Sequence, residues 1–341
     1  MRNTSKKLLA MLLAGTMSLT LLTACGSAKT AQSSTDTDST QAEEPATLDY
    51  PTKDITVIVP YGAGGTTDLC VRGVLDAVPD GTISSNFMVS NVTGGSGLVG
   101  ATQFANSAAD GYTIGVLNCD LVLNNVLGNT DITSDQFIPL ACIENDPYLF
   151  VVSKDAPYQT FEEFVEYAKA NPGTVTVADT GSGAAPHLAY LAMVQDLGLE
   201  LKTVSYDSAA DSVVAVVSGE VQAAITASGA AVGQMDGGNI VPLAVTSNER
   251  LSTYPDVPAM GELYDELADM QVNSWIMLAV SADTDPAIVE FLQQAFAPAA
   301  VSDAYKATQE GFFFQPVEEM SNEEMLSFVS SQHDYYTSLI G

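Results

Sequence analysis

The sequence predicts an α/β protein in which helices pack against parallel sheets. Short apolar strand patterns recur along the chain, and helix-like segments of roughly 10–15 residues separate them, as in βαβ units. Glycine-rich turns directly follow three of the strands, which end at Val59, Val89 and Val177. The 341 residues are enough for two domains of ordinary size.

The N-terminus has the features of a secretory signal peptide over residues 1–24. Arg2, Lys6 and Lys7 precede an apolar run, and small residues lead up to Cys25. The cysteine at the cleavage point resembles a bacterial lipobox, in which Cys25 carries the lipid. A transmembrane anchor is the alternative, but a spanning helix needs about 20 apolar residues and the run is shorter.

Residues 25–49 are predicted to be a disordered tether. They contain mostly Ser, Thr, Gln, Asp, Glu and Ala, so they have little apolar surface to bury. The folded part is therefore expected to begin near Tyr50 and to be held at a membrane surface outside the cytoplasm. Nothing after Tyr50 is long and apolar enough to predict a membrane span.

The expected elements follow in order along the chain. Thr160-x-x-Glu163 and Ser321-x-x-Glu324 are capping boxes that open helices, and a further helix follows Asp285. Strands are predicted at 55–59, 87–89, 112–117, 148–152, 175–177, 201–204, 221–225, 240–245 and 275–280. Helices are predicted at 68–78, 161–170 and 186–197, with helix-like segments between the strands of 201–245.

Composition excludes several classes of partner. The chain has 42 acidic and 11 basic residues, a net charge of −31, and removing the signal peptide makes it −34. A basic footprint for nucleic acid is absent, and the charge disfavours anionic lipid surfaces. After Cys25, the odd number of cysteines cannot form a complete disulfide framework, and each is predicted to be a buried small residue (Cys70, Cys119 and Cys142). With only His187 and His333 beside them, no metal site is expected.

Glycine-rich loops after strands suggest how an anion is held without a cationic patch. In open α/β sheets ligands bind beyond the carboxyl ends of the strands, where helix N-termini present free N–H groups. The first such loop, residues 60–68, lacks the lysine of a nucleotide-binding P-loop. Thr66 and Thr67 offer hydroxyls there, and Asp68 could cap the helix or accept a hydrogen bond from a ligand.

The second and third loops also admit enzyme interpretations. Gly95-x-Gly97-x-x-Gly100, with Asp120 twenty residues beyond, has dinucleotide-fingerprint spacing, but three glycines are a weak motif and we favour a packing role. Ser182 and His187 in the third loop could form a nucleophile and a base, but no nucleophile elbow with an orienting third group is assigned. We therefore predict no catalytic residues and no cofactor.

From Tyr50 onward the chain resembles the receptors of tripartite tricarboxylate transporters, the Bug family. The resemblance rests on the order and spacing of several motifs rather than on any one of them. They are the run 58–68, Asn91 with Gly94–Gly97, Ala109–Thr113, Gly181–Gly183 with His187-Leu188, Tyr206, Gly219–Gln222, Leu243–Ser247 with Arg250, Tyr254–Pro258 and Ser274-Trp275.

The resemblance implies a periplasmic-binding-protein-like fold with two Rossmann-like lobes and a double-crossover hinge. Lobe 1 would comprise residues 50–149 and 276–341, and lobe 2 residues 150–275. In this family, loops from both lobes hold the ligand carboxylate through backbone amides, hydroxyls and water. Carried over by position, the ligand-binding residues are Tyr61, Gly62, Gly64, Gly65, Thr66, Thr67 and Asp68 on one lobe and Thr180, Gly181, Ser182, Gly183 and His187 on the other.

Three stretches depart from the family pattern: Asp207 in place of lysine, Thr226-Ala227-Ser228, and Asn118-Cys119-Asp120. An acidic cleft rim is therefore expected, formed by Asp68, Asp120, Asp179 and Asp207. Such a rim disfavours a tricarboxylate and favours a monocarboxylate, a C4 dicarboxylate or an amino acid.

Together these features predict a monomeric, lipid-anchored extracytoplasmic receptor rather than an enzyme. It would close around a small carboxylate and deliver it to integral membrane transporter subunits. A ligand-sensing receptor of the same fold and an exported dinucleotide-dependent enzyme are the alternatives.

Overall fold

The computed structural model describes residues 48–206 and 208–341. The predicted signal peptide, Cys25 and nearly all of the predicted tether lie outside the described residues, as does Asp207. The segment Thr47–Gly341 forms one compact unit. Within the described ranges, no helix combines the length and the apolar character that a membrane crossing requires.

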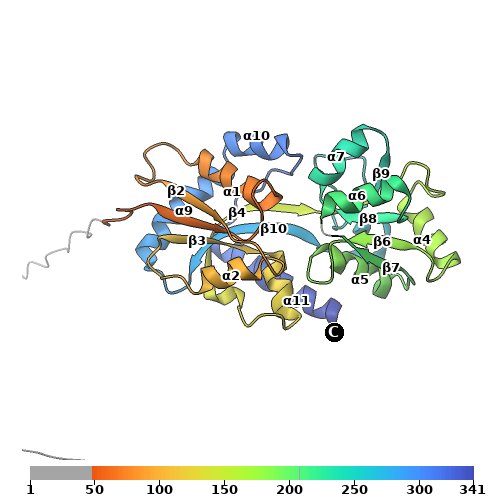
Figure 1. The fold of residues 1–341 in the computed structure, drawn as a ribbon, viewed down its shortest axis with the longest axis horizontal. Coiled ribbons are helices and arrows are strands. Elements are labelled where there is room, and N and C mark those ends of the chain that lie inside the picture. Colours follow the sequence, from red (N-terminus) through yellow and green to blue (C-terminus); the bar gives the residue numbers. More distant parts are fainter. Residues whose placement is uncertain (1–47, 207) are drawn as a thin grey trace, which may run out of the picture. The chain divides into compact units, whose positions relative to one another are not determined.

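The first sheet contains five strands in the order β2-β1-β3-β10-β4 (Figure 1). Strand β1 is parallel to β2 and β3, whereas β10 is antiparallel to both β3 and β4. One strand of this sheet therefore runs against the other four. The strands are β1 Ile55–Val59, β2 Phe87–Asn91, β3 Thr113–Asn118, β4 Phe137–Pro147 and β10 Asn273–Ser281.

The second sheet repeats this arrangement in the order β7-β6-β8-β5-β9. Strand β6 is parallel to β7 and β8, and β5 is antiparallel to β8 and β9. The strands are β5 Leu149–Ser153, β6 Thr176–Asp179, β7 Lys202–Ser205, β8 Ala223–Thr226 and β9 Ile240–Val245. Each sheet, with the helices packed on it, is called a lobe below.

The chain passes between the two sheets twice, which produces the double crossover. Only Tyr148 separates β4 from β5, and β10 returns to the first sheet after β9 is complete. Each of these crossing strands enters its sheet from the other lobe and runs against the neighbouring strands. The expectation of purely parallel sheets is therefore wrong for β5 and β10.

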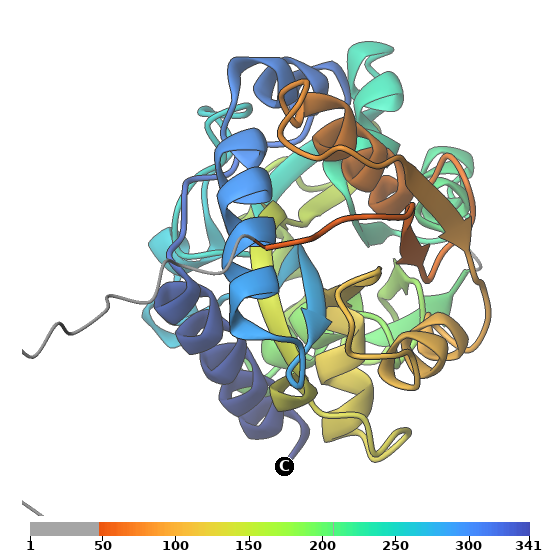
Figure 2. The same ribbon diagram turned by 90° about the vertical axis from the view of Figure 1, so that its left-hand side faces the viewer.

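Helices cover the sheets in both lobes. In the first lobe α9 and α11 pack on β4, and Figure 2 shows the helices near the C-terminus, in blue, lying over that sheet. The helices of this lobe are α1 Thr66–Ala77, α2 Leu98–Ala105, α3 Cys119–Val126, α9 Pro286–Ala300, α10 Asp303–Gly311 and α11 Asn322–Ile340, with the 3-10 turn Ser134–Gln136.

In the second lobe α6 packs on β5 and β8. Its helices are α4 Phe161–Ala170, α5 Pro186–Asp196, α6 Ala209–Ser218, α7 Ser228–Asp236 and α8 Met260–Leu263, with the 3-10 turn Asp265–Leu267.

Both predicted capping boxes begin helices. At α11 the Ser321 hydroxyl accepts from the Glu324 N–H, and the Glu324 carboxylate accepts from the Ser321 N–H. At α4 the Thr160 hydroxyl accepts from the Glu163 N–H, but the Glu163 carboxylate accepts from the N–H one residue before the cap. The helix starts predicted from these boxes are confirmed.

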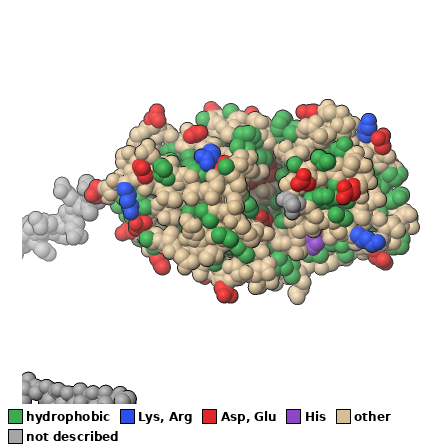
Figure 3. Space-filling view, in the orientation of Figure 1, with side chains coloured by type: hydrophobic (Ala, Val, Ile, Leu, Met, Phe, Trp, Pro, Cys, Tyr) green, Lys and Arg blue, Asp and Glu red, His purple; other side chains and the backbone are tan. Residues whose placement is uncertain are grey.

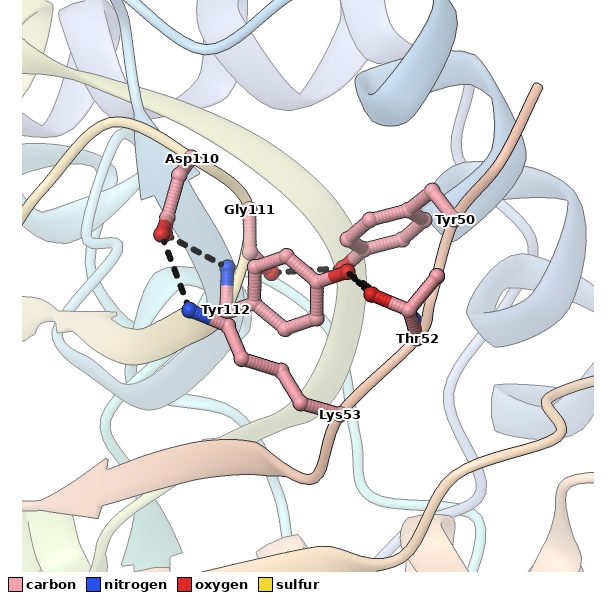
Figure 4. A network of polar contacts seen from close by, with 6 residues as sticks. All are labelled: Tyr50, Thr52, Lys53, Asp110, Gly111 and Tyr112. Atoms are coloured by element: carbon pink, nitrogen blue, oxygen red, sulfur yellow. Dashed lines mark hydrogen bonds and ion pairs between the residues drawn. The ribbon is translucent and has the colours of Figure 1, made fainter.

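A polar network holds the first described residues against the loop before β3 (Figure 4). The Tyr50 hydroxyl donates to the Gly111 carbonyl at 2.6 Å, and Lys53 pairs with Asp110 at 3.3 Å. The Lys53 ammonium also lies 4.1 Å from the centre of the Tyr112 ring. A side chain at Gly111 would collide with a neighbouring isoleucine, which explains why glycine occurs there. These contacts join the first described residues to the rest of the compact unit.

The three cysteines of the described region are buried and unpaired. Burial raises the pKa of each thiol, to about 12 for Cys142. Their predicted role as small buried side chains is confirmed.

Candidate functional site

A cavity of about 540 Å³ lies between the lobes, where loops at strand ends of both sheets meet. Figure 3 shows a hollow between the two halves of the molecule on the face drawn. Among the described residues that line the cavity, none is Lys, Arg or His, and Asp120 is the one acid. The lining residues are Tyr61, Gly62, Ala63, Gly65, Thr66, Thr67, Asn118, Cys119, Asp120, Tyr148, Thr180, Ala184, Pro186, Ser208, Ala209, Ile225, Thr226, Ala227, Ser274 and Ile276.

The first-lobe wall is built from the β1–α1 loop. Helix α1 begins at Thr66, and its N-cap residue Gly65 provides no side-chain cap for the first N–H groups. Thr66 and Thr67 add hydroxyls beside these amides, and both line the cavity. The positive end of the helix dipole and the uncapped N–H groups favour a negative charge at this position.

The second-lobe wall contains a similar feature at α7. This helix begins at Ser228 after the N-cap residue Ala227, which also provides no side-chain cap. Thr226, the last residue of β8, is fully buried, and its hydroxyl has no hydrogen-bond partner among the described residues. A buried polar group without a partner is costly, so a ligand atom is the natural partner for this hydroxyl.

A tyrosine and two polar residues at the end of β3 form one network in the cavity wall. The Asn118 amide donates to the Tyr61 hydroxyl at 2.8 Å, and that hydroxyl donates to the Asp120 carboxylate at 2.7 Å. Asp120 also accepts from the backbone N–H of Ala185 at 3.3 Å. Because Ala185 is the N-cap residue of α5, this contact joins the two lobes across the cleft. Burial raises the pKa of Asp120 above its ordinary value.

Two further acids lie behind the first-lobe wall on β4. Glu144 is buried beside Ser274, and burial raises its pKa well above the ordinary value. Burial likewise raises the pKa of Asp146 to about 7, even though the Gln315 N–H donates to its carboxylate at 2.9 Å. Neither acid lines the cavity.

Six of the twelve residues predicted to bind ligand line the cavity: Tyr61, Gly62, Gly65, Thr66, Thr67 and Thr180. Asp68 does not, because its carboxylate faces inward and accepts from the Gly64 N–H, Arg72 and Asn91 at 2.8 to 3.0 Å. Burial opposes the charge on Asp68, but these hydrogen bonds outweigh it and lower the pKa. Asp68 therefore organises the loop, and Gly64 lies beside it, outside the cavity lining.

The remaining predicted residues lie around the start of α5 without lining the cavity: Gly181, Ser182, Gly183 and His187. The His187 ring pairs with the buried Asp179 at 2.6 Å, and among the described residues it makes no hydrogen bond to Ser182. Asp179 also accepts from the Gly181 N–H at 2.9 Å. The Gly183 carbonyl accepts from Asn124 of α3 at 3.1 Å, a second contact between the lobes.

These contacts correct the expectation of an acidic rim. Asp68 and Asp179 are both buried and bound by their own neighbours, and Asp207 lies outside the described residues. Of the three expected rim acids that the structure describes, only Asp120 lines the cavity. The physical reason is that a buried carboxylate needs hydrogen-bond donors inside the protein. The sequence pattern does not reveal which carboxylates find such donors and are thereby kept out of the cavity.

Gly100, the last glycine of the G-x-G-x-x-G spacing, has the predicted packing role. A side chain there would lie 2.8 Å from the backbone of Pro60 and of Val92. The glycine thus lets α2 approach the end of β1 closely.

Several cavity residues were not predicted as binding residues. In the sequence Thr226, Ala227 and Asn118 stand out only as departures from the family pattern, whereas Asp120 is also expected at the cleft rim. Their position at the carboxyl ends of β3 and β8 was the signal that could have identified them. Ser274 and Tyr148 lie on or beside the crossing strands, for which the sequence offers no comparable signal.

Comparison with known proteins places these features in context. A family description, tripartite tricarboxylate transporter family receptor, matches residues 71–341. A UPF0065 protein of Bordetella pertussis is 27% identical over 285 residues, covering 83% of this chain and 87% of the relative. Among solved structures, a TctC solute-binding protein from Polaromonas without ligand has a TM-score of 0.74 and 29% identity, covering 85% of this chain and 99% of that one. A Rhodopseudomonas palustris protein with adipate has a TM-score of 0.73 and 25% identity, covering 85% and 97%.

Proposed function

Because the chain belongs to the tripartite tricarboxylate transporter receptor family, we propose that it captures a small carboxylate outside the cytoplasm and delivers it to the membrane subunits of such a transporter. The observation that carries the carboxylate assignment is the cavity between the lobes, where the N-termini of α1 and α7 lack side-chain caps. The adipate bound by the related R. palustris protein supports the same ligand class.

The cavity chemistry is suited to binding rather than to turnover. A carboxylate between α1 and α7 would accept from backbone N–H groups and from the hydroxyls of Thr66, Thr67 and Thr226. No histidine, cysteine–histidine pair or cluster of metal ligands lines this space among the described residues. We expect the ligand to leave unchanged.

Lobe closure is the proposed mechanism. A ligand that contacts α1 of one lobe and α7 of the other binds the closed arrangement better than an open one, so it shifts the population toward closure. We propose residues 50–149 and 276–341 as lobe 1 and 150–275 as lobe 2, with hinges near Tyr148 and in 273–280. The closed form is the species that the membrane subunits would recognise.

The proposed location follows from the N-terminal pattern. We propose that residues 1–24 are removed, that Cys25 is lipidated, and that residues 25–49 tether a monomeric receptor to the membrane surface. Mass spectrometry of the membrane fraction would test this, because a Cys25→Ser variant should lose the lipid and appear in the soluble fraction.

Thermal unfolding of segment 47–341 with a ligand panel tests the binding function. The panel contains mono-, di- and tricarboxylates, amino acids and NAD. A bound ligand at about 100 times its Kd should add about 2.7 kcal/mol to the free energy of unfolding, which raises the midpoint by several degrees. An Ala227→Leu variant, which places bulk in the cavity, should lose the shift, whereas Ala170→Leu on the exposed face of α4 should keep it. A shift with NAD alone would overturn the proposal.

A further inference from the structure

The charge of the cavity wall is unusual for a receptor of anions. Among the described lining residues the single ionisable carboxylate is Asp120, and no cationic side chain offsets it. An anion entering this space therefore meets a like charge, and only backbone dipoles and uncharged hydroxyls attract it. A ligand that binds well must therefore offset the negative charge of Asp120.

The hydrogen bonds of Asp120 indicate that it is held as a carboxylate. The Tyr61 hydroxyl donates to Oδ2, while the Ala185 N–H and, more weakly, the Cys119 thiol donate to Oδ1. Asn118 fixes the direction of the Tyr61 hydroxyl by donating to its oxygen. Three donors aimed at one carboxyl group favour its ionised form and oppose the rise in pKa that burial causes. Oδ1 already accepts from two of them, whereas Oδ2 accepts from Tyr61 alone and keeps room for one more donor.

Asp120 also occupies the anion site of one helix. Helix α5 has no side-chain cap of its own, and its first residue, Pro186, has no N–H to donate. The N–H of the N-cap residue Ala185 already donates to Asp120. A ligand carboxylate is therefore directed to α1 and α7, which remain uncapped. The N-termini of α1 and α7 thus favour a negative group, whereas Asp120 favours a positive one.

From this arrangement we propose that Asp120 selects zwitterionic ligands, amino acids whose carboxylate lies at the α1 and α7 N-termini and whose ammonium group donates to Asp120. An ammonium group supplies the positive charge that the described wall lacks and a donor for the free acceptor position on Oδ2 of Asp120. This inference rests on the proposed carboxylate-receptor function and narrows its ligand class.

The test uses ligand series that share a carbon skeleton and differ at one group. Alanine, lactate, pyruvate and propionate form one series, and leucine with its 2-hydroxy and 2-oxo analogues forms a second. Isothermal titration of the purified protein measures Kd for each compound. In the unmodified protein the amino acid should bind at least 10-fold more tightly than the 2-oxo acid of its series. This comparison needs no variant, so it remains decisive if substitutions impair folding.

An Asp120→Asn variant removes the charge while keeping a polar side chain. It should lose at least 10-fold in affinity for the amino acid while the 2-oxo acid binds equally well or better. Asp131→Asn, in the exposed loop after α3, makes the same change of net charge and should leave both affinities unchanged.

The outcomes separate the two proposals. If hydroxy acids, oxo acids or unsubstituted acids bind as tightly as amino acids, or if Asp120→Asn leaves their ratio unchanged, the role of Asp120 is overturned while the carboxylate-receptor function stands. If the protein binds no carboxylate of any class, both proposals fail.

Discussion

Thr226 illustrates how one side chain can mark a binding site. It ends β8, it is fully buried, and its hydroxyl lacks a partner within the described residues although it lines the cavity. Asp68 is the opposite case. The sequence predicts that it binds ligand, but its carboxylate accepts hydrogen bonds from donors inside the protein. At the scale of the residue, the presence or absence of internal partners separates a ligand contact from a structural group.

A Thr226→Val substitution tests this distinction. Removing a buried hydroxyl without a partner should leave the free energy of unfolding unchanged or slightly higher. Losing one hydrogen bond to a ligand carboxylate should weaken binding by about 10-fold, measured by isothermal titration. Thr226→Ser keeps the hydroxyl and is the matched control. Equal ligand affinity in the valine variant would show that the hydroxyl does not contact the ligand.

Strand β4 is a buried strand that contains acidic residues. It carries Glu144 and Asp146 in a buried position, and Pro139 interrupts its apolar pattern. Pairing along its whole length with β10 keeps it in the sheet despite these residues. Burial of both acids makes the stability of this element depend on pH.

Asp146 provides a prediction with a defined sign. Its pKa is about 7 in the folded protein against 3.8 ordinarily, so the folded state holds this proton more tightly than the unfolded state. The contribution of Asp146 should therefore decrease the free energy of unfolding as pH rises from about 4 to about 7, by on the order of 1–4 kcal/mol. Asp146→Asn should flatten this decline in urea unfolding curves recorded across that range, whereas exposed Asp76→Asn should not. A decline of unchanged size in Asp146→Asn would contradict the assignment.

Several hydrogen bonds join the lobes at the scale of the whole molecule, and two of them involve the loop before α5. Asp120 accepts from Ala185, and Asn124 donates to the Gly183 carbonyl. In an open state, water could hydrogen-bond to each of these donors and acceptors. Each bond should therefore add only modestly to the stability of the closed state. Closure should therefore remain adjustable by ligand.

An Asn124→Ala variant should favour the open arrangement. Loss of one cross-lobe bond worth about 1 kcal/mol should weaken ligand affinity roughly 3- to 10-fold and increase the radius of gyration without ligand, measured by small-angle X-ray scattering. Asn125→Ala is the control, because the Asn125 amide donates to Thr130 within its own lobe. An unchanged radius and affinity in Asn124→Ala would exclude a latch role for this contact.

Much of the fold could be predicted because its signals are local. The strand pattern at Ile55–Val59, the capping box at Ser321 and the close-packing glycine Gly100 each depend on a few neighbouring residues. Strand β4 was missed because Pro139, Glu144 and Asp146 obscure its apolar character. Its place depends on β10, more than 120 residues later, which no local pattern encodes.

By itself, the sequence determined the α/β class, most of the strands, and the glycine-rich loops that offer backbone donors in place of cations. These properties follow from periodicity, turn chemistry and composition. Only the tertiary structure decided which loops face the cleft, that Asp68 and Asp179 are used internally, and that Asp120 reaches the start of α5. Those outcomes depend on contacts between residues far apart in the chain, where burial and competing donors decide the partner of each polar group.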